Sequence, residues 1–545
     1  MFRLLQGLLK DSNIKYEIIL FISILCVAAA HLLKLDSIPP SFFQDESSIA
    51  YNAALIAQTG KDEYNIPFPI YFKSFGDYKA PIYVYAVALI FKLFGISEFN
   101  SRFTSFIFYI LALIFTLLLV RIIFKKNWII EMYALITFGF LPQFFIASRV
   151  SFEVISQLTS ITLVALLVKL AFRASKQRWW INSFICGVVL GVSVYTYPTA
   201  RILTFLSLIS LWTIYIKRDN IKKLVLITAC FFASLIPYFS FAVSNSEALT
   251  ARLKGISYLY LPISIPEKIL RFLYNYMRYI SPDFLIKNGD VSMNSLRNST
   301  GYGGVVFSVT FILFLIGLAH VLFNKKLRNR FNIFLIANLI FAPVAGALTS
   351  DVNALRSILL GYYILIISCY GLKLVMLARR YVRVKLLICI FLILLFELSG
   401  YIFNYFVYYP ANSIESVEMS FNFKGLLQSA VSQSPNEVLF IPYLSTDIAH
   451  LNFYRYLVVN SRNIPIKVIS YDGLTKDLNN KCLLYYTVDQ PRLKNLPYQF
   501  TEFRNEMQTN GVLKLISAKV PEARLRVRCL KGMSDGHSPR SLPEP

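Results

Sequence analysis

The chain has 545 residues, of which 56% are hydrophobic, and its mean hydropathy is +0.55. This composition excludes an ordinary soluble protein and is typical of a polytopic α-helical membrane protein. The formal net charge of +25 does not indicate nucleic-acid binding, because the basic residues cluster in short loops between apolar runs. The seven cysteines contain no C-x-x-C pair, so neither a zinc site nor a disulfide framework is indicated.

The apolar runs predict the membrane spans, and the charges decide how many runs cross. The question is whether a short run at 81–95, which contains Lys92, crosses the membrane. If it lies at the outer surface, all six Lys/Arg clusters of the helical part fall on the cytoplasmic side. We therefore predict eleven spans, with the N-terminus inside, the C-terminus outside and 81–95 as a juxtamembrane helix. The predicted spans are 16–35, 103–122, 128–147, 152–172, 180–197, 201–216, 222–243, 303–323, 331–349, 354–377 and 384–405.

This topology predicts a membrane domain over 1–405 with two large outer loops, 36–102 and 244–302. The region 406–520 differs, because its apolar runs shrink to strand length, and it predicts a small extracytoplasmic α/β domain. The stretch 521–545 is rich in Arg, Ser and Pro without periodicity and predicts a disordered tail. Within the α/β domain we expect a helix at about 414–432 and strands at 438–443, 456–459, 464–470, 483–488 and 512–516.

Polar residues on the outer side form a distinct pattern. Asp45 and Glu46 follow the first span in a loop that also holds Lys79. Adjacent carboxylates at a membrane surface repel each other and cost solvation energy, so they usually handle protons, cations or polar substrates. Single arginines at outer helix ends oppose the topological bias, and a phosphate would suit their forked guanidinium groups. These arginines are Arg102, Arg149, Arg201 and Arg356.

Each of these residues also has a structural explanation. A lone arginine at a helix end commonly snorkels to lipid headgroups. Arg149 and Glu153 have the i, i+4 spacing of an intrahelical ion pair. Tyr195 and Tyr197 fit an aromatic belt, and Asp290 fits an ordinary outer turn. Four arginines on one face, beside a carboxylate pair, favour a functional cluster.

Other sequence features narrow the chemistry. There is no phosphate-binding glycine motif and no D-x-D, so no nucleotide site is indicated. The few histidines lie away from the polar cluster in the sequence, which disfavours a Ser-His-Asp hydrolase or a His-ligated zinc site. Gly187 and Gly191 form a G-x-x-x-G that predicts close helix packing. An activated donor at the outer face would therefore have to arrive with the membrane.

At these residues the chain resembles the GT-C glycosyltransferases, specifically bacterial relatives of the dolichyl-phosphate-mannose–protein mannosyltransferases and of the lipid A aminoarabinose transferase. The resemblance covers about 36–405 and rests on the order and spacing of short motifs. The matching pieces are Gln44-Asp45-Glu46, Gly60-Lys61-Asp62, Lys79-Ala80-Pro81, Arg102, Ser148-Arg149 with Phe152-Glu153, Tyr195-Thr196-Tyr197-Pro198 with Arg201, Ser281-Pro282-Asp283-Phe284 with Gly289-Asp290, and Ala354-Leu355-Arg356. Many relatives have two prolines where this chain has Ala80-Pro81.

The resemblance implies a polyprenyl-phosphate-linked sugar as donor and an inverting single displacement at the outer face of the cytoplasmic (inner) membrane. By this analogy Asp45 is the catalytic base, Glu46 positions hydroxyl groups, and Lys79 and the four arginines hold the donor phosphate. The predicted substrate contacts are Glu153, Tyr195, Tyr197 and Asp290. No cofactor is required, although some relatives use a divalent metal near the first-loop carboxylates, here near Asp45.

The acceptor stays open between a glycan, a lipid and a protein. An alternative function is a transporter or flippase for a lipid-linked or anionic glycan, which would also use arginines and carboxylates. A transporter should place polar residues at mid-membrane depth. Here the charges crowd the outer ends of the spans, which favours chemistry at the surface. A third hypothesis is that the protein binds lipid phosphate without catalysing a reaction.

Overall fold

The computed structural model describes residues 14–40, 42–74, 76–173, 179–246, 248–290, 299–410, 423–432, 436–440, 447–459, 464–469, 481–486, 501–503 and 525–529. They form two compact units. The first comprises Met1–Pro39 and Asn52–Ser413, and the second comprises Pro40–Tyr51 and Ile414–Pro545. Helix α3 (Gln44–Thr59) therefore begins in the second unit and ends in the first.

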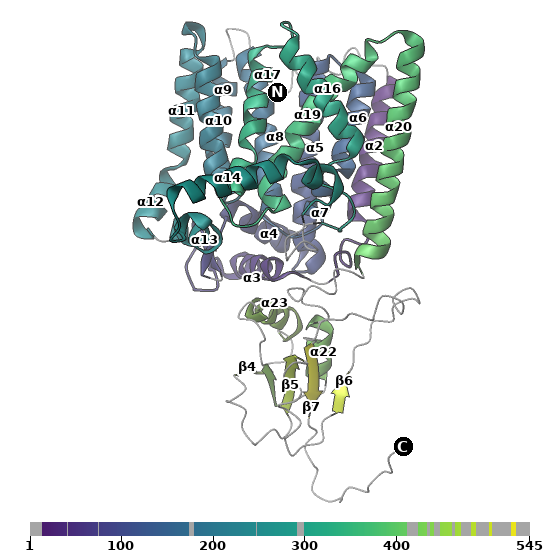
Figure 1. Cartoon of the computed structure of the whole chain (residues 1–545). Coiled ribbons are helices and arrows are strands. Elements are labelled where there is room, and N and C mark those ends of the chain that lie inside the picture. The colour runs from purple at the N-terminus through teal and green to yellow at the C-terminus, as the bar shows by residue number, and fades with distance from the viewer. Residues whose placement is uncertain are drawn as a thin grey trace, which may run out of the picture. The chain divides into compact units, whose positions relative to one another are not determined.

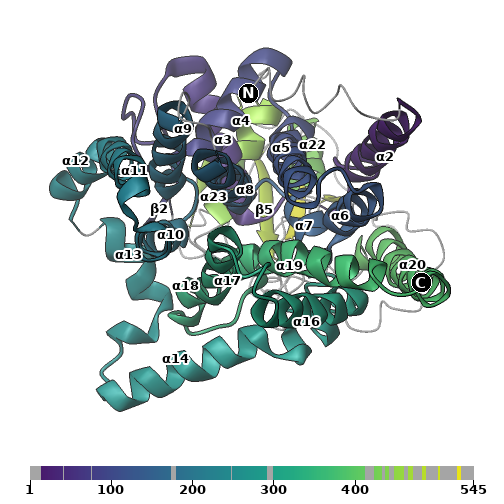
Figure 2. The same cartoon turned by 90° about the horizontal axis from the view of Figure 1, so that it is seen from above.

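The first unit is a bundle of apolar helices (Figures 1 and 2). Each of the eleven predicted spans corresponds to one helix or to consecutive helices. Among the described residues, seven helical segments are long and apolar enough to cross a membrane, and the number that cross stays a prediction. The span helices are α2 (Ile14–Leu32), α5 (Glu98–Phe124), α6 (Trp128–Phe140) with α7 (Pro142–Ala147), α8 (Val154–Arg173), α9 (Trp179–Val192) with η1 (Ser193–Tyr195), α10 (Ala200–Tyr215), α11 (Ile221–Ser234) with α12 (Ile236–Ser244), α16 (Ser308–Phe323), α17 (Arg330–Phe341) with α18 (Val344–Ala347), η5 (Ala354–Ser357) with α19 (Ile358–Met376), and α20 (Arg380–Phe403) with η6 (Asn404–Tyr408).

Shorter elements connect the spans. Helix α4 begins at Pro81, which suits a first helical position because it has no amide hydrogen to leave unpaired, and it ends at Gly95, where φ is 89°. The hydroxyl of Ser97 then accepts a hydrogen bond from the Asn100 amide at 3.1 Å and starts α5. The connecting elements are β1 (Phe72–Ser74), β2 (Asp77–Lys79), α4 (Pro81–Phe94), η2 (Arg218–Asn220), α13 (Ala248–Ile256), η3 (Tyr258–Tyr260), α14 (Ile265–Ile280) and η4 (Asp283–Lys287).

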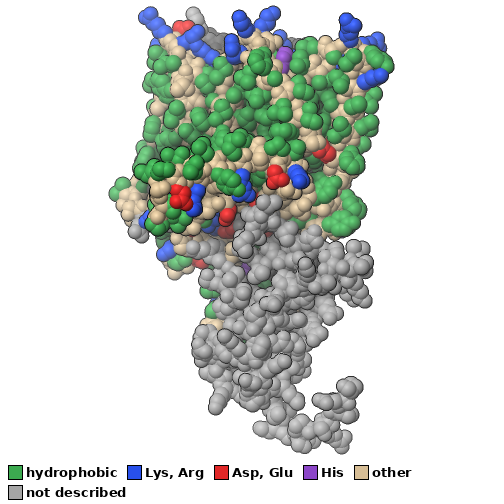
Figure 3. Space-filling model, in the orientation of Figure 1, with side chains coloured by type: hydrophobic (Ala, Val, Ile, Leu, Met, Phe, Trp, Pro, Cys, Tyr) green, Lys and Arg blue, Asp and Glu red, His purple; other side chains and the backbone are tan. Residues whose placement is uncertain are grey.

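Charge is distributed unevenly along the bundle. Lysine and arginine side chains gather at one end, next to a broad hydrophobic belt, and acidic and basic side chains mix toward the other end (Figure 3). This is the distribution expected when short basic loops share one side of a membrane.

Helices α9 and α11 meet at small residues. A β-carbon at Gly187 would lie 2.4 Å from the carbonyl oxygen of Ile227, and one at Gly191 would lie 2.7 Å from that of Phe231. No side chain fits at these distances, so only glycine permits the contact. The prediction that this G-x-x-x-G serves helix packing is confirmed.

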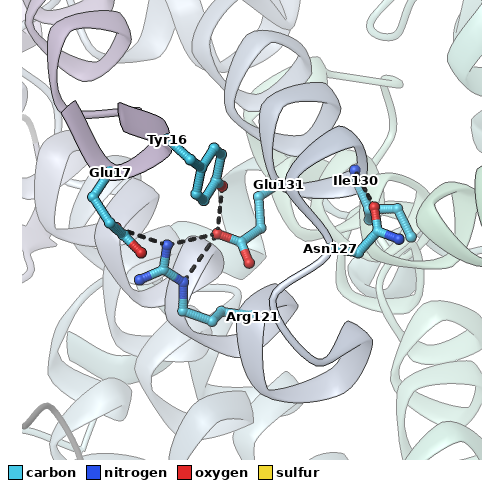
Figure 4. Close-up of polar contacts among 6 residues, drawn as sticks. All are labelled: Tyr16, Glu17, Arg121, Asn127, Ile130 and Glu131. Atoms are coloured by element: carbon cyan, nitrogen blue, oxygen red, sulfur yellow. Dashed lines mark hydrogen bonds and ion pairs between the residues drawn. The ribbon is translucent and has the colours of Figure 1, made fainter. Parts of the chain in front are cut away.

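A buried ionic network joins α2, α5 and α6 (Figure 4). The guanidinium Nη2 of Arg121 lies 3.0 Å from Glu17 Oε2 and 2.9 Å from Glu131 Oε2. The Tyr16 hydroxyl donates to the same Glu131 oxygen at 2.7 Å. One cation is thus enclosed by two carboxylates, which compensates the cost of burying charge.

Helix α14 lies across the bundle rather than along it (Figures 1 and 2). Ser264 is its N-cap, since the Ser264 hydroxyl accepts from the Glu267 amide at 3.4 Å. One face packs inward through Asn275 and Tyr279, while apolar residues such as Leu270 stay exposed. This is the pattern of an interfacial helix, and the sequence interpretation did not single it out.

The second unit contains a mixed five-stranded sheet in the order β4-β3-β5-β7-β6. Strands β3, β4 and β5 are parallel, and β7 runs antiparallel to both β5 and β6. Its elements are α22 (Phe423–Ser432), β3 (Glu437–Phe440), α23 (Asp447–Val459), β4 (Ile466–Val468), β5 (Lys481–Tyr486), β6 (Thr501–Phe503) and β7 (Leu525–Cys529).

Two sequence predictions in this unit are wrong. The segment 456–459 ends helix α23 instead of forming a strand, because a short apolar run does not distinguish a strand from part of a helix. Residues 525–529 form an edge-proximal strand inside the stretch predicted to be disordered. The rest of that stretch, and the predicted strand at 512–516, lie outside the described residues.

Candidate functional site

A short hairpin in the first outer loop positions Lys79. Strands β1 and β2 pair antiparallel, with Phe72 opposite Lys79, and Gly76 lies in the turn with φ of 74°. Lys79 ends β2, and only Ala80 separates it from α4, so its backbone lies between two regular elements. Its Nζ lies 5.8 Å from the centroid of the Phe152 ring, within range of a cation–π contact. The amide of Ala80 donates to the buried carboxylate of Glu153.

Aromatic rings extend this arrangement to the start of α10. The ring of Phe152 meets that of Tyr197 edge-on, with centroids 5.9 Å apart. The guanidinium of Arg201 lies 5.2 Å from the centroid of the buried Tyr71 ring. The structure therefore brings together four predicted site residues, which are Lys79, Glu153, Tyr197 and Arg201.

A carboxylate lies among these cations. Asp77 Oδ2 is 3.5 Å from Nε of Arg252, a residue of α13 in the second outer loop. Burial raises the pKa of the Asp77 carboxyl above its ordinary value. The Tyr78 amide and the charges of Arg252, Lys79 and Arg201 act in the opposite direction. Sequence analysis missed Asp77 and Arg252, although the position of Asp77 two residues before Lys79 was a signal that could have been used.

Tyr195 has a structural role. Its hydroxyl donates to the carbonyl of Ser234 at 2.9 Å and accepts from the amide of Tyr238 at 2.9 Å. It thereby bridges the break between α11 and α12, where backbone groups lose their helical partners. This geometry favours the structural explanation over the predicted substrate contact.

Arg149 is fully buried and binds the protein's own backbone. Its guanidinium donates to six acceptors on the first span, the loop after it and η6, and it does not pair with Glu153. The acceptors are the carbonyls of Ala30, His31, Leu33, Lys34 and Ile38 and the hydroxyl of Tyr405. Arg149 therefore caps the end of α2 and fixes the entry to the first outer loop.

Arg102 holds the same loop from the other side. It is also fully buried, and Nη1 donates to the carbonyls of Leu35 at 3.2 Å and Pro39 at 2.8 Å. For both buried arginines the geometry supports positioning of the loop rather than direct contact with a phosphate.

Asp290 and Arg356 organise the loop between α18 and α19. Buried Asp290 accepts from the amide of Ala354 at 2.9 Å. Half-buried Arg356 donates to the Thr349 hydroxyl at 2.7 Å and to the Asp351 carbonyl at 3.2 Å. The two predicted site residues thus act on one loop.

Asp45 and Glu46 occupy the first turn of α3, in the second unit, and both are buried. Glu46 Oε2 accepts from the Phe43 amide at 3.0 Å and so caps the helix, where a carboxylate also favours the helix dipole. The next residue, Ser47, lies 2.8 Å from His450 Nδ1 through its hydroxyl. The expectation that no histidine lies near this pair is therefore wrong, because His450 is distant only in sequence.

The residues that the structure describes include no group of three or more His, Cys, Asp or Glu side chains placed to hold a metal ion.

The helical fold is similar to that of GT-C membrane glycosyltransferases. Residues 78–241 match the family model of dolichyl-phosphate-mannose-protein mannosyltransferases, a range that contains Lys79, Arg102, Arg149, Glu153 and Arg201. No curated protein matches the chain.

Solved structures share the fold. ArnT from Cupriavidus metallidurans in the apo state is 12% identical, with a TM-score of 0.58, and the match covers 95% of this chain and 98% of that one. ArnT bound to undecaprenyl phosphate gives a TM-score of 0.53 at 12% identity, covering 97% and 100%. The oligosaccharyltransferase AglB from Archaeoglobus fulgidus, in complex with an inhibitory peptide and a dolichol-phosphate, is 15% identical, with a TM-score of 0.51, covering 82% and 64%. The predicted resemblance to GT-C glycosyltransferases is confirmed.

Proposed function

We propose that this protein is a glycosyltransferase that moves a sugar from a polyprenyl-phosphate donor to an acceptor on the outer face of the cytoplasmic membrane. The observation that carries the proposal is the meeting of Lys79 and Arg201 with Glu153 and aromatic rings. It occurs within a fold shared with ArnT, which has been solved with undecaprenyl phosphate. The proposed topology has eleven spans, with the α/β domain outside.

The chemistry follows from where charge develops. When a sugar leaves a phosphate, negative charge builds on the phosphate oxygens, and fixed cations stabilise it most in the transition state. Lys79 and Arg201 supply such cations from rigid neighbours, β2 and α10. We assign donor binding to these two residues first.

Asp45 is the proposed base that takes the acceptor proton in an inverting single displacement. Glu46 already binds the Phe43 amide, so its first role is to fix the helix turn that carries Asp45. Arg102 and Arg149 position the loop that leads into this turn. The acceptor is a hydroxyl-bearing glycan, lipid or protein.

The test is sugar transfer from synthetic polyprenyl-phosphate sugars by the purified full-length protein. Asp45→Asn should lose about 10²–10⁴-fold in rate while donor binding is retained, because only the proton acceptor is removed. Asp36→Asn, an exposed aspartate in the same loop, is the matched control and should keep full activity. Unchanged activity of Asp45→Asn would overturn the base assignment. Movement of intact donor across vesicles without transfer would instead identify a flippase.

A further inference from the structure

The ion pair between Asp77 and Arg252 joins the two outer loops. Asp77 belongs to the first-loop hairpin and Arg252 to helix α13 of the second loop. The side chain of Asp77 is 20% exposed and that of Arg252 is 45% exposed. The contact is therefore at the edge of the site, where an incoming ligand can reach it.

The hairpin directs several charges to one place. Residues two apart in a strand point to the same face, so Asp77 and Lys79 share a face of β2. The guanidinium of Arg201 packs against the ring of Tyr71, which precedes β1. Lys79, Arg201 and Arg252 all act electrostatically on the Asp77 carboxylate. The charges of three cations, carried by β2, α10 and α13, thus act on one carboxylate, and Arg252 contacts it directly.

The Asp77 carboxylate is not an ideal partner for these cations. Its Oδ2 lies 3.5 Å from Nε of Arg252, longer than the roughly 2.7–2.9 Å of a strong charge-assisted hydrogen bond. Partial burial also disfavours its charged form in spite of the three cations. A phosphate offers more acceptor oxygens and matches the fork of a guanidinium group.

We propose that Asp77 holds the place of the donor phosphate while the site is empty, and that the phosphate displaces Asp77 from Arg252 when the donor binds. This inference rests on the proposed donor class. It makes Asp77 a negative determinant of donor affinity and Arg252 a phosphate ligand, and it couples donor binding to the contact between the hairpin and α13.

The experiment measures binding of polyprenyl phosphate without sugar to the full-length protein in nanodiscs of phosphatidylcholine. Asp77→Asn should lower Kd about tenfold, because a competing anion is removed, and Arg252→Gln should raise it about tenfold. In the double variant the gain from Asp77→Asn should largely vanish, because Asp77 acts through Arg252. Glu267→Gln and Arg271→Gln are the controls, since Arg271 lies in the same outer loop as Arg252, is similarly exposed and pairs with Glu267 at 2.8 Å, and both should leave Kd unchanged.

The possible outcomes separate the two proposals. If the wild type binds normally and Asp77→Asn leaves Kd unchanged or raises it, the proposal that phosphate displaces Asp77 is wrong. The proposed glycosyltransferase activity is not affected by that result. Absence of polyprenyl-phosphate binding by the wild type overturns both. If Asp77→Asn fails to fold, Arg252→Gln alone still decides, because its side chain is exposed and an unchanged Kd contradicts the proposal.

Discussion

The Arg121 network and the Asp77 cluster are opposite solutions to the same electrostatic problem. In the first, Arg121 lies between two carboxylates from two other helices at 2.9–3.0 Å, and its partner Glu131 is fully buried. In the second, the charges of three cations, on a hairpin, a helix start and a loop helix, act on one carboxylate, and its ion pair with Arg252 is 3.5 Å long and partly exposed.

The difference separates contacts that hold the fold from contacts that can be exchanged. A cation compensated by buried protein carboxylates has nothing to gain from a ligand. A carboxylate among cations can be replaced by a better anion at little cost, because the cations keep a partner throughout. Substitutions in the two clusters should therefore differ in how far they lower thermal stability.

The largest effect is expected for Glu131→Gln. This change leaves Arg121 buried with one of its two carboxylates removed, and breaking a buried pair typically costs roughly 3–5 kcal/mol. We expect a large fall of the thermal midpoint in detergent, followed by intrinsic fluorescence. Asp77→Asn should shift that midpoint far less. Equal falls of the thermal midpoint in Glu131→Gln and Asp77→Asn would contradict the distinction between the two clusters.

The next effect should come from Arg149→Lys. A lysine has three donors and no fork, so several of the six acceptors around Arg149 would be left buried without a partner, at a cost on the order of 2 kcal/mol. The thermal midpoint should fall, and protease should cut the chain faster in the loop after α2. Arg201→Lys is the control and should keep both properties, because Arg201 contacts a ring face that a lysine also suits. A similar fall of the thermal midpoint in Arg201→Lys would mean that Arg201, like Arg149, stabilises the fold.

These two arginines show what the sequence can predict. Each stands alone at an outer helix end, and nothing in the local sequence distinguishes them. Arg149 meets carbonyls left over where α2 ends, and those acceptors exist only after the chain has folded. The sequence therefore identifies which residues are unusual at this face but not which of them remain available to a ligand.

The helices were easier to predict than the site. Long apolar runs and basic loops act locally, so every predicted span has a helical counterpart. His450 and Arg252 depend on contacts between segments far apart in the chain, which periodicity does not report. Short apolar runs such as 456–459 are ambiguous between helix and strand, and the choice here was wrong.

The smallest effect is expected for His450→Ala. Ser47 and His450 share a buried hydrogen bond, and the loss of such a bond typically costs only about 1 kcal/mol, well below the ionic network. The same unit is also held by Phe42 stacked on Phe453, with centroids 5.4 Å apart, which the variant keeps. Hydrogen exchange should therefore rise in the first turn of α3, which carries Asp45, while α13 stays unchanged. Ser47→Ala should reproduce the effect, because it removes the other partner of the same bond. Faster exchange in α13 as well would mean that the contacts holding the Asp45 turn and the exchangeable contact at Asp77 form one system, and the division between them would fail.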